Sequence, residues 1–270
     1  MQTALHTVSR MRIALGTFIA IEAQASSRER ALRGIETAFD AVASVDRLMH
    51  PTRPGSDLAA LAGAPRGTRV PVHPWTWEVL DLSRELGERS AGAFDPCLET
   101  APGRLTDIDL SGRGFAVPHD RVHVDLGGIA KGFALDRAVD ALRAAGCDGG
   151  LVNAGGDLAV FGLATHRIVR MSSDGTGAAL ELKDCALAAS DVECAKRPTE
   201  HRGYYHGVDR GRTIAGSATV IAPSAAVADA LTKCVLLADP GLGQNLLEAF
   251  GARALRQDLR TPGPAPDRSA

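Results

Sequence analysis

The sequence predicts an α+β protein whose mixed or antiparallel sheets are flanked by helices. Two observations predict this class. Apolar residues recur at helical spacing over residues 27–50, 74–89 and 129–145. Short apolar runs instead alternate with turns over residues 166–220, as antiparallel strands do. The chain has 270 residues, of which 45% are hydrophobic, so it is long enough to enclose a sizeable core.

The N-terminal region predicts a first strand. Residues 12–23 are rich in β-branched residues, and we interpret them as this strand. The competing interpretation is a short signal peptide, because two arginines precede an apolar run at residues 13–21 and Ala23-Gln-Ala25 resembles a cleavage site. The strand is favoured because Gly16-Thr17 interrupts the apolar run.

The sequence predicts three helices, separated by breaks, over residues 27–89. A helix is expected over residues 27–50, and the prolines and glycine of residues 50–56 end it. Ser56 is a typical cap for a short helix that continues to residue 61. Residues 67–74 are expected to form an edge strand or an extended link, and a proline opens a second long helix at 74–89.

The middle of the chain predicts a compact strand–loop–helix–strand unit. A hairpin is expected over residues 103–122 and a strand at 122–126. A helix over 129–145 ends at Gly146, and a second strand covers 150–161. Such a unit places a ligand loop at the N-terminus of its helix.

The C-terminal part predicts a strand, a turn at Pro223-Ser224 and a helix over residues 216–239, followed by a final helix at 242–255. We therefore expect a single domain over residues 1–255. Residues 256–270 are polar and rich in proline, which predicts a disordered tail.

Composition excludes several classes of function. The formal net charge is −2 and aromatic residues make up 4%, which argues against a nucleic-acid partner. The five cysteines are odd in number and lack Cys-x-x-Cys spacing, which favours a reducing compartment. The expected location is therefore the cytoplasm, or the periplasm if the N-terminal segment is a signal. No run reaches the ~20 apolar residues of a transmembrane span.

Residues 124–132, "VDLGGIAKG", have the ingredients of an anion-binding loop. The glycines expose backbone groups, the following helix N-terminus is partly positive, and Lys131 adds a full charge. The loop is not a P-loop, because Phe133 stands where a lysine is required. Asp125 would repel a phosphate, unless it meets a hydroxyl or helps to organise a metal.

Three further segments carry carboxylates: "NAGGD" at 153–157, "GAFDP" at 92–96 and "ADALTK" at 228–233. In the last, Asp229, Thr232 and Lys233 share one helix face, which is suited to presenting oxygens to magnesium. Each segment alone is also consistent with a turn or a helix-capping carboxylate. Tyr204-Tyr205-His206 is a further candidate ligand contact. These local features indicate only an enzyme acting on an anionic ligand.

Six segments occur in one order across residues 11–250, and together the chain resembles the ApbE-like FAD:protein FMN transferase family. They are "LGTFIAI", "GSDLAALAG", "GAFDP", "VDLGGIAKGFALDRAVDALRAAG", "LVNAGGDLAVFG" and "GSATVIAPSAAVADALTK". The resemblance implies a T-fold-related architecture of two lobes with a cleft. It implies FAD as substrate, Mg²⁺ as cofactor, and transfer of FMN to a threonine of a partner flavoprotein with release of AMP.

The resemblance also implies a set of site residues. The implied contacts with FAD are Leu15, Thr52, Ala93, Phe94, Asp95, Asp125, Lys131, Ser190 and His206. The Gly128 carbonyl and the Asp229 carboxylate would ligate the metal, with Thr232 and Lys233 beside them. Asp125, Asp229 and Lys233 are the candidate catalytic residues, with Asp125 or another carboxylate accepting the threonine proton.

This chain departs from the family pattern at several positions. Leu15 stands in place of a methionine, and Thr52 lies where an aromatic residue is usual. The segment "HGVDRGRT" at 206–213 keeps only a histidine and an aspartate of the usual motif. A metal-binding threonine is expected four residues after Asp229, where this chain has Lys233.

Two accounts of Lys233 are open from the sequence. Its ammonium lies near the cation position and weakens metal binding, or Thr232 supplies the oxygen and Lys233 contacts a phosphate. The rival functions are a flavin-binding module that does not catalyse transfer and a metal-dependent FAD pyrophosphatase.

Overall fold

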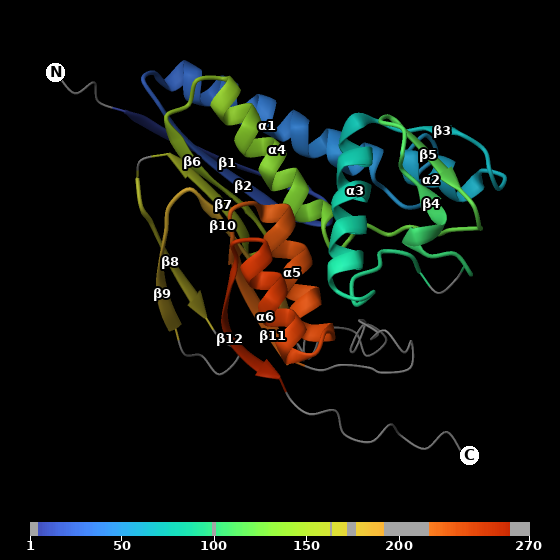
Figure 1. Ribbon diagram of the computed structural model, residues 1–270. Helices are drawn as coiled ribbons and strands as arrows, with labels where there is room; N and C mark the ends of the chain where they lie inside the picture. Colours follow the sequence, from blue (N-terminus) through green and yellow to red (C-terminus); the bar gives the residue numbers. More distant parts are fainter. Residues whose placement is uncertain (1–4, 99–100, 163, 172–176, 192–215, 260–270) are drawn as a thin grey trace, which may run out of the picture.

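A seven-stranded antiparallel sheet forms the centre of the fold (Figure 1). The computed structural model describes residues 5–98, 101–162, 164–171, 177–191 and 216–259. The strand order is β1-β2-β6-β7-β10-β11-β12. The strands are β1 (His6–Ala14), β2 (Thr17–Ala25), β6 (Gly149–Ala154), β7 (Asp157–Gly162), β10 (Cys185–Asp191), β11 (Gly216–Ala222) and β12 (Arg253–Leu259).

Helices cover one face of this sheet. They are α1 (Arg28–Leu48), α4 (Ala130–Ala144), α5 (Ala225–Leu237) and α6 (Pro240–Ala249). Helix α1 packs on β1 and β2, α4 on β6 and β7, and α5 on β10 and β11, so that α4 lies between α1 and α5 (Figure 1). Helix α4 therefore contacts both α1 and α5.

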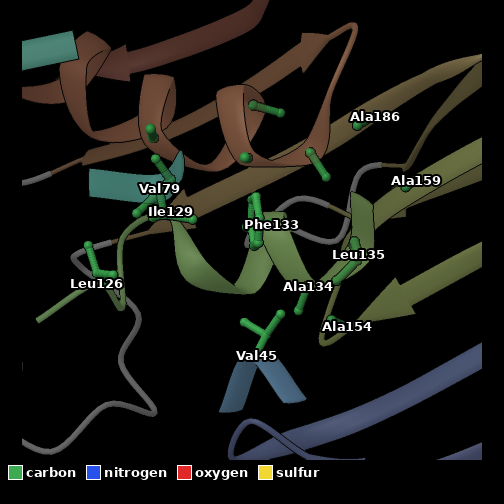
Figure 2. Packing of buried hydrophobic residues seen from close by; sticks show 14 of the residues in the cluster. Val45, Val79, Leu126, Ile129, Phe133, Ala134, Leu135, Ala154, Ala159 and Ala186 are labelled. Carbon is green, nitrogen blue, oxygen red and sulfur yellow. The ribbon is translucent and has the colours of Figure 1, made fainter. Parts of the chain in front are cut away.

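The core between helices and sheet is built largely from small and aliphatic side chains (Figure 2). Phe133, Ala134 and Leu135 of α4 are buried, with Val45 of α1 nearby and Ala154 of β6 on the sheet side. Alanines at these contacts let the helices approach the sheet closely, which fixes the start of α4 relative to α5.

A hairpin of β8 (His166–Met171) and β9 (Gly177–Leu182) forms a separate two-stranded sheet. Leu182 of this hairpin joins Leu158, Val160, Leu187 and Ile221 of the main sheet in a second apolar cluster. In Figure 1 the hairpin lies away from the helices.

A smaller group of elements lies beside α1 and α4 (Figure 1). It contains α2 (Asp57–Gly63), α3 (Pro74–Arg89), the 3₁₀ helix η1 (Leu105–Asp107) and a three-stranded sheet, β3 (Val70–Pro71), β5 (Phe115–Pro118) and β4 (Ile108–Asp109) in that order. Ser56 caps α2, since its hydroxyl accepts the Ala59 amide at 3.1 Å, and proline opens α3.

The α+β class with antiparallel sheets and flanking helices is confirmed, but two predicted single strands are hairpins. Residues 12–23 turn at Leu15-Gly16, where φ is 51° and 70°. Residues 150–161 turn at Gly155-Gly156, where φ is 61° and 103°. Sequence reasoning took these glycines as interruptions within a strand, whereas their left-handed backbone reverses the chain.

Other boundaries also differ. The strand expected at 122–126 is wrong, because the structure there has only an isolated bridge from Val124 to Cys97. The final helix ends at Ala249 instead of 255, and β12 follows it to Leu259, beyond the start of the predicted tail. The single-domain boundary itself stays a prediction. No helix among the described residues combines the length and apolarity needed to cross a membrane.

Candidate functional site

The loop that precedes α4 is bent by Asp125. Its Oδ1 accepts the Gly127 amide at 2.8 Å, and its own amide donates to the Pro96 carbonyl at 2.9 Å. The first contact is an Asx turn, in which an aspartate side chain accepts the backbone amide two residues further along the chain. The loop then enters α4 at Ala130, so the backbone of residues 127–129 lies at the partly positive end of that helix.

This loop forms one wall of a cavity of about 510 Å³. Three other segments complete the lining: the turn between β1 and β2, the end of α1 with the residues that follow it, and the turn between β6 and β7. Side chains or backbone that line the cavity include Leu15, Thr17, His50, Asp125, Lys131 and Gly155. Four segments far apart in sequence therefore meet at the start of α4 and form a concave site for a ligand.

Lys131 links the cavity to a buried carboxylate. Its ammonium forms an ion pair with Oδ2 of Asp157, which is the first residue of β7. Oδ1 of Asp157 accepts the Ala189 amide at 3.0 Å. Burial and the negative charge of Asp229 raise the pKa of Asp157, while Lys131 opposes this shift. The carboxylates of Asp157 and Asp229 thus share one poorly solvated region.

Asp229 is 1% exposed, and the donors around it engage both its carboxylate and its carbonyl. The Gly132 amide donates to Oδ2 at 3.2 Å, and the Lys233 ammonium pairs with Oδ1. The Asp229 carbonyl accepts the Thr232 hydroxyl at 2.7 Å and the Lys233 ammonium at 2.9 Å. The carboxylate is therefore held inside the protein, between α4 and the next turn of α5.

Close packing brings α4 and α5 together at this point. A Cβ on Gly132 would lie 2.1 Å from the Ala225 carbonyl oxygen, so only glycine fits. One turn later, the carboxylate of Asp136 accepts the amides of Ala225 at 2.7 Å and Ala226 at 2.9 Å. A residue of α4 thereby caps the N-terminus of α5, and burial raises the pKa of Asp136 to about 6.

Lys233 also reaches the loop at Gly128. A Cβ built on Gly128 would lie 3.5 Å from Cε of Lys233 and 3.8 Å from Cε2 of Phe94. The structure thus brings together Gly128, Phe94, Asp229 and Lys233, which sequence reasoning drew from three separate motifs. Asp229 and Lys233 are not among the residues that line the 510 Å³ cavity.

The remaining expected site residues lie in several different places. Thr52 is exposed, and its amide donates to Nδ1 of His50 at 3.3 Å. Ala93 is buried. Asp95 accepts the Cys97 amide at 2.9 Å and contacts Arg104 at 3.4 Å, so it organises its own turn.

Ser190 and Thr232 are buried and face each other, with their hydroxyl oxygens 2.7 Å apart. Because the Thr232 hydroxyl donates to the Asp229 carbonyl, Ser190 donates to Thr232 in this arrangement. His206 and the Tyr204-Tyr205 pair lie outside the described residues.

Sequence reasoning missed four residues as members of the site. His50 and Thr17 line the cavity, although nothing in their local sequence marks them. Asp157 was interpreted as a turn residue, and its position in "NAGGD" was the available signal. No sequence signal marked Asp136, because a carboxylate within an amphipathic helix ordinarily faces solvent.

None of the four cysteines in the part of the chain that the structure describes lines this cavity. Burial is the leading cause that raises the pKa of Cys97, Cys147 and Cys234, to about 12 for Cys234. A thiol with a raised pKa stays protonated and is a poor nucleophile, and Cys147 and Cys234 are buried in the core.

The order of these segments along the chain matches a family model described as "ApbE family", which covers residues 15–107 and 101–255. The chain belongs to the ApbE family. Its fold agrees: the flavinyl transferase ApbE of Pseudomonas stutzeri superposes with a TM-score of 0.79 at 20% identity, covering 96% of this chain and 92% of that one. A flavin transferase ApbE from Vibrio cholerae gives a TM-score of 0.76 at 18% identity, covering 96% and 95%.

Relatives of this ApbE-family chain carry the name FAD:protein FMN transferase. One from Treponema pallidum is 25% identical over 85% of this chain and 78% of its own length. One from Rhodobacter capsulatus is 27% identical over 57% of this chain. The match spans only 35% of the Rhodobacter protein, about a third of its length.

The ApbE-family expectation of a magnesium site can be tested on the donors around Asp229. Magnesium requires near-octahedral oxygen ligands at about 2.1 Å. Here Oδ1 of Asp229 is paired with an ammonium, Oδ2 accepts an amide, and the nearby Thr232 hydroxyl is bonded to Ser190. Within the described part of the chain, no three acidic, histidine or cysteine side chains converge on one point.

The positive charge of Lys233 also argues against a magnesium ion at Asp229. At about 4 Å and an effective dielectric of about 20, an ammonium and a divalent ion repel by about 8 kcal/mol, which equals the attraction one carboxylate offers at that distance. With Lys233 in place, Asp229 therefore provides no net electrostatic gain for Mg²⁺. The residues present do not fit the ion.

Proposed function

We propose that this chain is an FAD:protein FMN transferase, which moves FMN from FAD to a threonine of an acceptor flavoprotein and releases AMP. The observation that carries the proposal is the cavity at the start of α4, where Lys131 and the glycine loop face Leu15 and His50. Membership of the ApbE family supports FAD as the ligand. The name of the relatives supports a protein acceptor, and the resemblance of the motifs supports a threonine as its target.

In the proposed complex, the diphosphate of FAD lies along Gly127-Gly128. The partly positive N-terminus of α4 and the Lys131 ammonium neutralise its oxygens. The ion pair with Asp157 restricts where the Lys131 ammonium can lie. Asp125 lines the same wall and is too negative to meet phosphate, so we assign it to a hydroxyl of the substrate or the acceptor.

The proposed reaction is a displacement at the phosphorus on the FMN side. The threonine Oγ forms a bond to this phosphorus while the bond to the bridging oxygen breaks, and AMP leaves with that oxygen. The threonine proton passes to the Asp125 carboxylate and then to solvent. Magnesium has no step here, because the donors around Asp229 do not fit it. The reducing location in the cytoplasm remains part of the proposal and rests on cysteine usage.

Product analysis tests this function. The chain is incubated with FAD and an acceptor domain that carries the target threonine, and the acceptor is examined by intact mass while nucleotides are separated chromatographically. Covalent FMN on the acceptor with an equal amount of AMP is the expected result. Free FMN and AMP without labelling would instead identify a pyrophosphatase, and bound but intact FAD would identify a flavin-binding module. A threonine-to-valine acceptor is the matched control.

A further inference from the structure

We propose that Lys233 is a built-in replacement for a divalent cation, so that this chain handles its anionic ligand without bound metal. The ammonium pairs with Oδ1 and with the backbone carbonyl of Asp229. It is 5% exposed and lies four residues after Asp229 on α5, so the helix itself sets the position. A charge fixed in this way is present before any ligand arrives.

The charges of the buried cluster balance only with this lysine. Asp157 and Asp229 are 2% and 1% exposed, and each pairs with one ammonium, from Lys131 and Lys233. Two negative and two positive groups sum to zero, as a poorly solvated site requires. A threonine at position 233 would leave one uncompensated negative charge, which a metal ion would have to neutralise.

The path of the lysine side chain places it against the anion-binding loop. Cδ and Cε of Lys233 pass within 3.9 Å and 3.5 Å of the position that a Cβ on Gly128 would take. Gly128 is therefore bordered by the aliphatic part of the Lys233 side chain and by Phe94. A second lysine, Lys131, lies in the first turn of α4, directly after this loop. Lysine side chains from two helices, α4 and α5, therefore lie at this loop, each paired with a buried carboxylate.

Thr232 does not offer the missing oxygen to a metal. Its hydroxyl donates to the Asp229 carbonyl and contacts Ser190 on β10, so it is directed at the sheet. This arrangement favours the account in which Lys233 lies at the cation position over the account in which Thr232 replaces the usual ligand.

The inference rests on the proposed function for the identity of the anion, the FAD diphosphate, but its test does not. Mn²⁺ is titrated into the full chain, and uptake is followed by electron paramagnetic resonance of the free ion. We expect no uptake by the parent protein and about one Mn²⁺ per chain for Lys233→Thr, which offers a hydroxyl and frees the carboxylate. Lys233→Met is the matched control, because it removes the charge without adding an oxygen, and it should bind about tenfold more weakly than Lys233→Thr.

Two results would overturn the inference: uptake by the parent chain as tight as by Lys233→Thr, or no uptake by either protein. The double variant Asp229→Asn with Lys233→Met shows whether a neutral cluster folds, and it should take up no Mn²⁺. The proposed function fails separately, if FAD does not bind or yields no labelled acceptor while the Mn²⁺ results stand.

Discussion

The Gly132 amide donates a 3.2 Å hydrogen bond to Oδ2 of Asp229, 97 residues further along the chain. This contact joins the first turn of α4 to α5 at the point where the anion-binding loop ends. It is possible only because residue 132 has no side chain, since a Cβ there would lie 2.1 Å from the Ala225 carbonyl oxygen. The position of Asp229 relative to the loop therefore depends on a glycine.

Gly132→Ala should destabilise the protein by about 3 kcal/mol, because a Cβ in this space forces α4 and α5 apart and overpacked sites cost about this much. Urea unfolding measures the change. Gly241→Ala on α6 is the control, because a Cβ there meets nothing within 4 Å and alanine favours helix. Equal stability of the two variants would show that the contact between the helices is loose.

Asp229 and Lys233 should be strongly coupled in a double-mutant cycle. Removing either charge alone leaves the other buried without its partner, at a cost of about 3–5 kcal/mol. The pair Asp229→Asn with Lys233→Met should lose clearly less than the sum of the two single variants. Unfolding free energies of the four proteins give the coupling energy. Additive losses, within about 0.5 kcal/mol, would mean that the ion pair does not hold the cluster together.

Because of Asp136, the free energy of unfolding should fall as pH rises from about 4 to about 6. Burial raises its pKa in the folded protein from 3.8 to about 6, so the folded state binds the proton more tightly than the unfolded chain. The stabilising contribution is complete below the unfolded pKa and is lost as pH rises through the folded one. At most about 3 kcal/mol is involved.

The measurement for Asp136 is urea unfolding of the parent chain and of Asp136→Asn at several pH values. The variant cannot titrate at this position, so the difference in unfolding free energy isolates the carboxyl. We expect the advantage of the parent over the variant to shrink with increasing pH. An advantage that grows would show that the amides of Ala225 and Ala226 outweigh burial in setting this pKa.

Lys131→Met should weaken FAD binding by about tenfold or more, because a charge-assisted contact with phosphate is lost. Quenching of flavin fluorescence gives the affinity, and a thermal melt shows whether the unpaired Asp157 disturbs the fold. Lys183→Met is the matched control, since Lys183 is exposed and does not line the cavity. Similar losses in both variants would place the flavin elsewhere.

Much of the fold could be predicted from local pattern. Helical periodicity located α1, α3 and α4 to within about two residues, because each has one apolar face. Helix α5 is buried on nearly every side, and the turn at Pro223-Ser224 marked its start instead. The hairpins at Leu15-Gly16 and Gly155-Gly156 were missed, because both strands of each have the same composition and only the positive φ angles mark the turn. The helix predicted at 242–255 likewise extended past the end of α6 into the first residues of β12.

The candidate site was predictable in its motifs but not in its contacts. The glycines and Lys131 mark an anion-binding loop on their own, and the spacing of Asp229 and Lys233 places them on one helix face. The pairing of Lys131 with Asp157 depends on β7 starting beside α4, which no local rule reveals. His50 lines the cavity only because α1 ends beside the loop. Such contacts come from tertiary packing.

The central claim is that the anion-binding loop and Lys131 bind the diphosphate of FAD without a divalent cation, because Lys233 occupies the position of that cation beside Asp229. Isothermal titration calorimetry of FAD into the full chain, once in EDTA and once in excess magnesium, tests it most directly. The account predicts the same stoichiometry and the same affinity in both buffers. Binding that appears only with magnesium would contradict it, and so would the absence of binding in both.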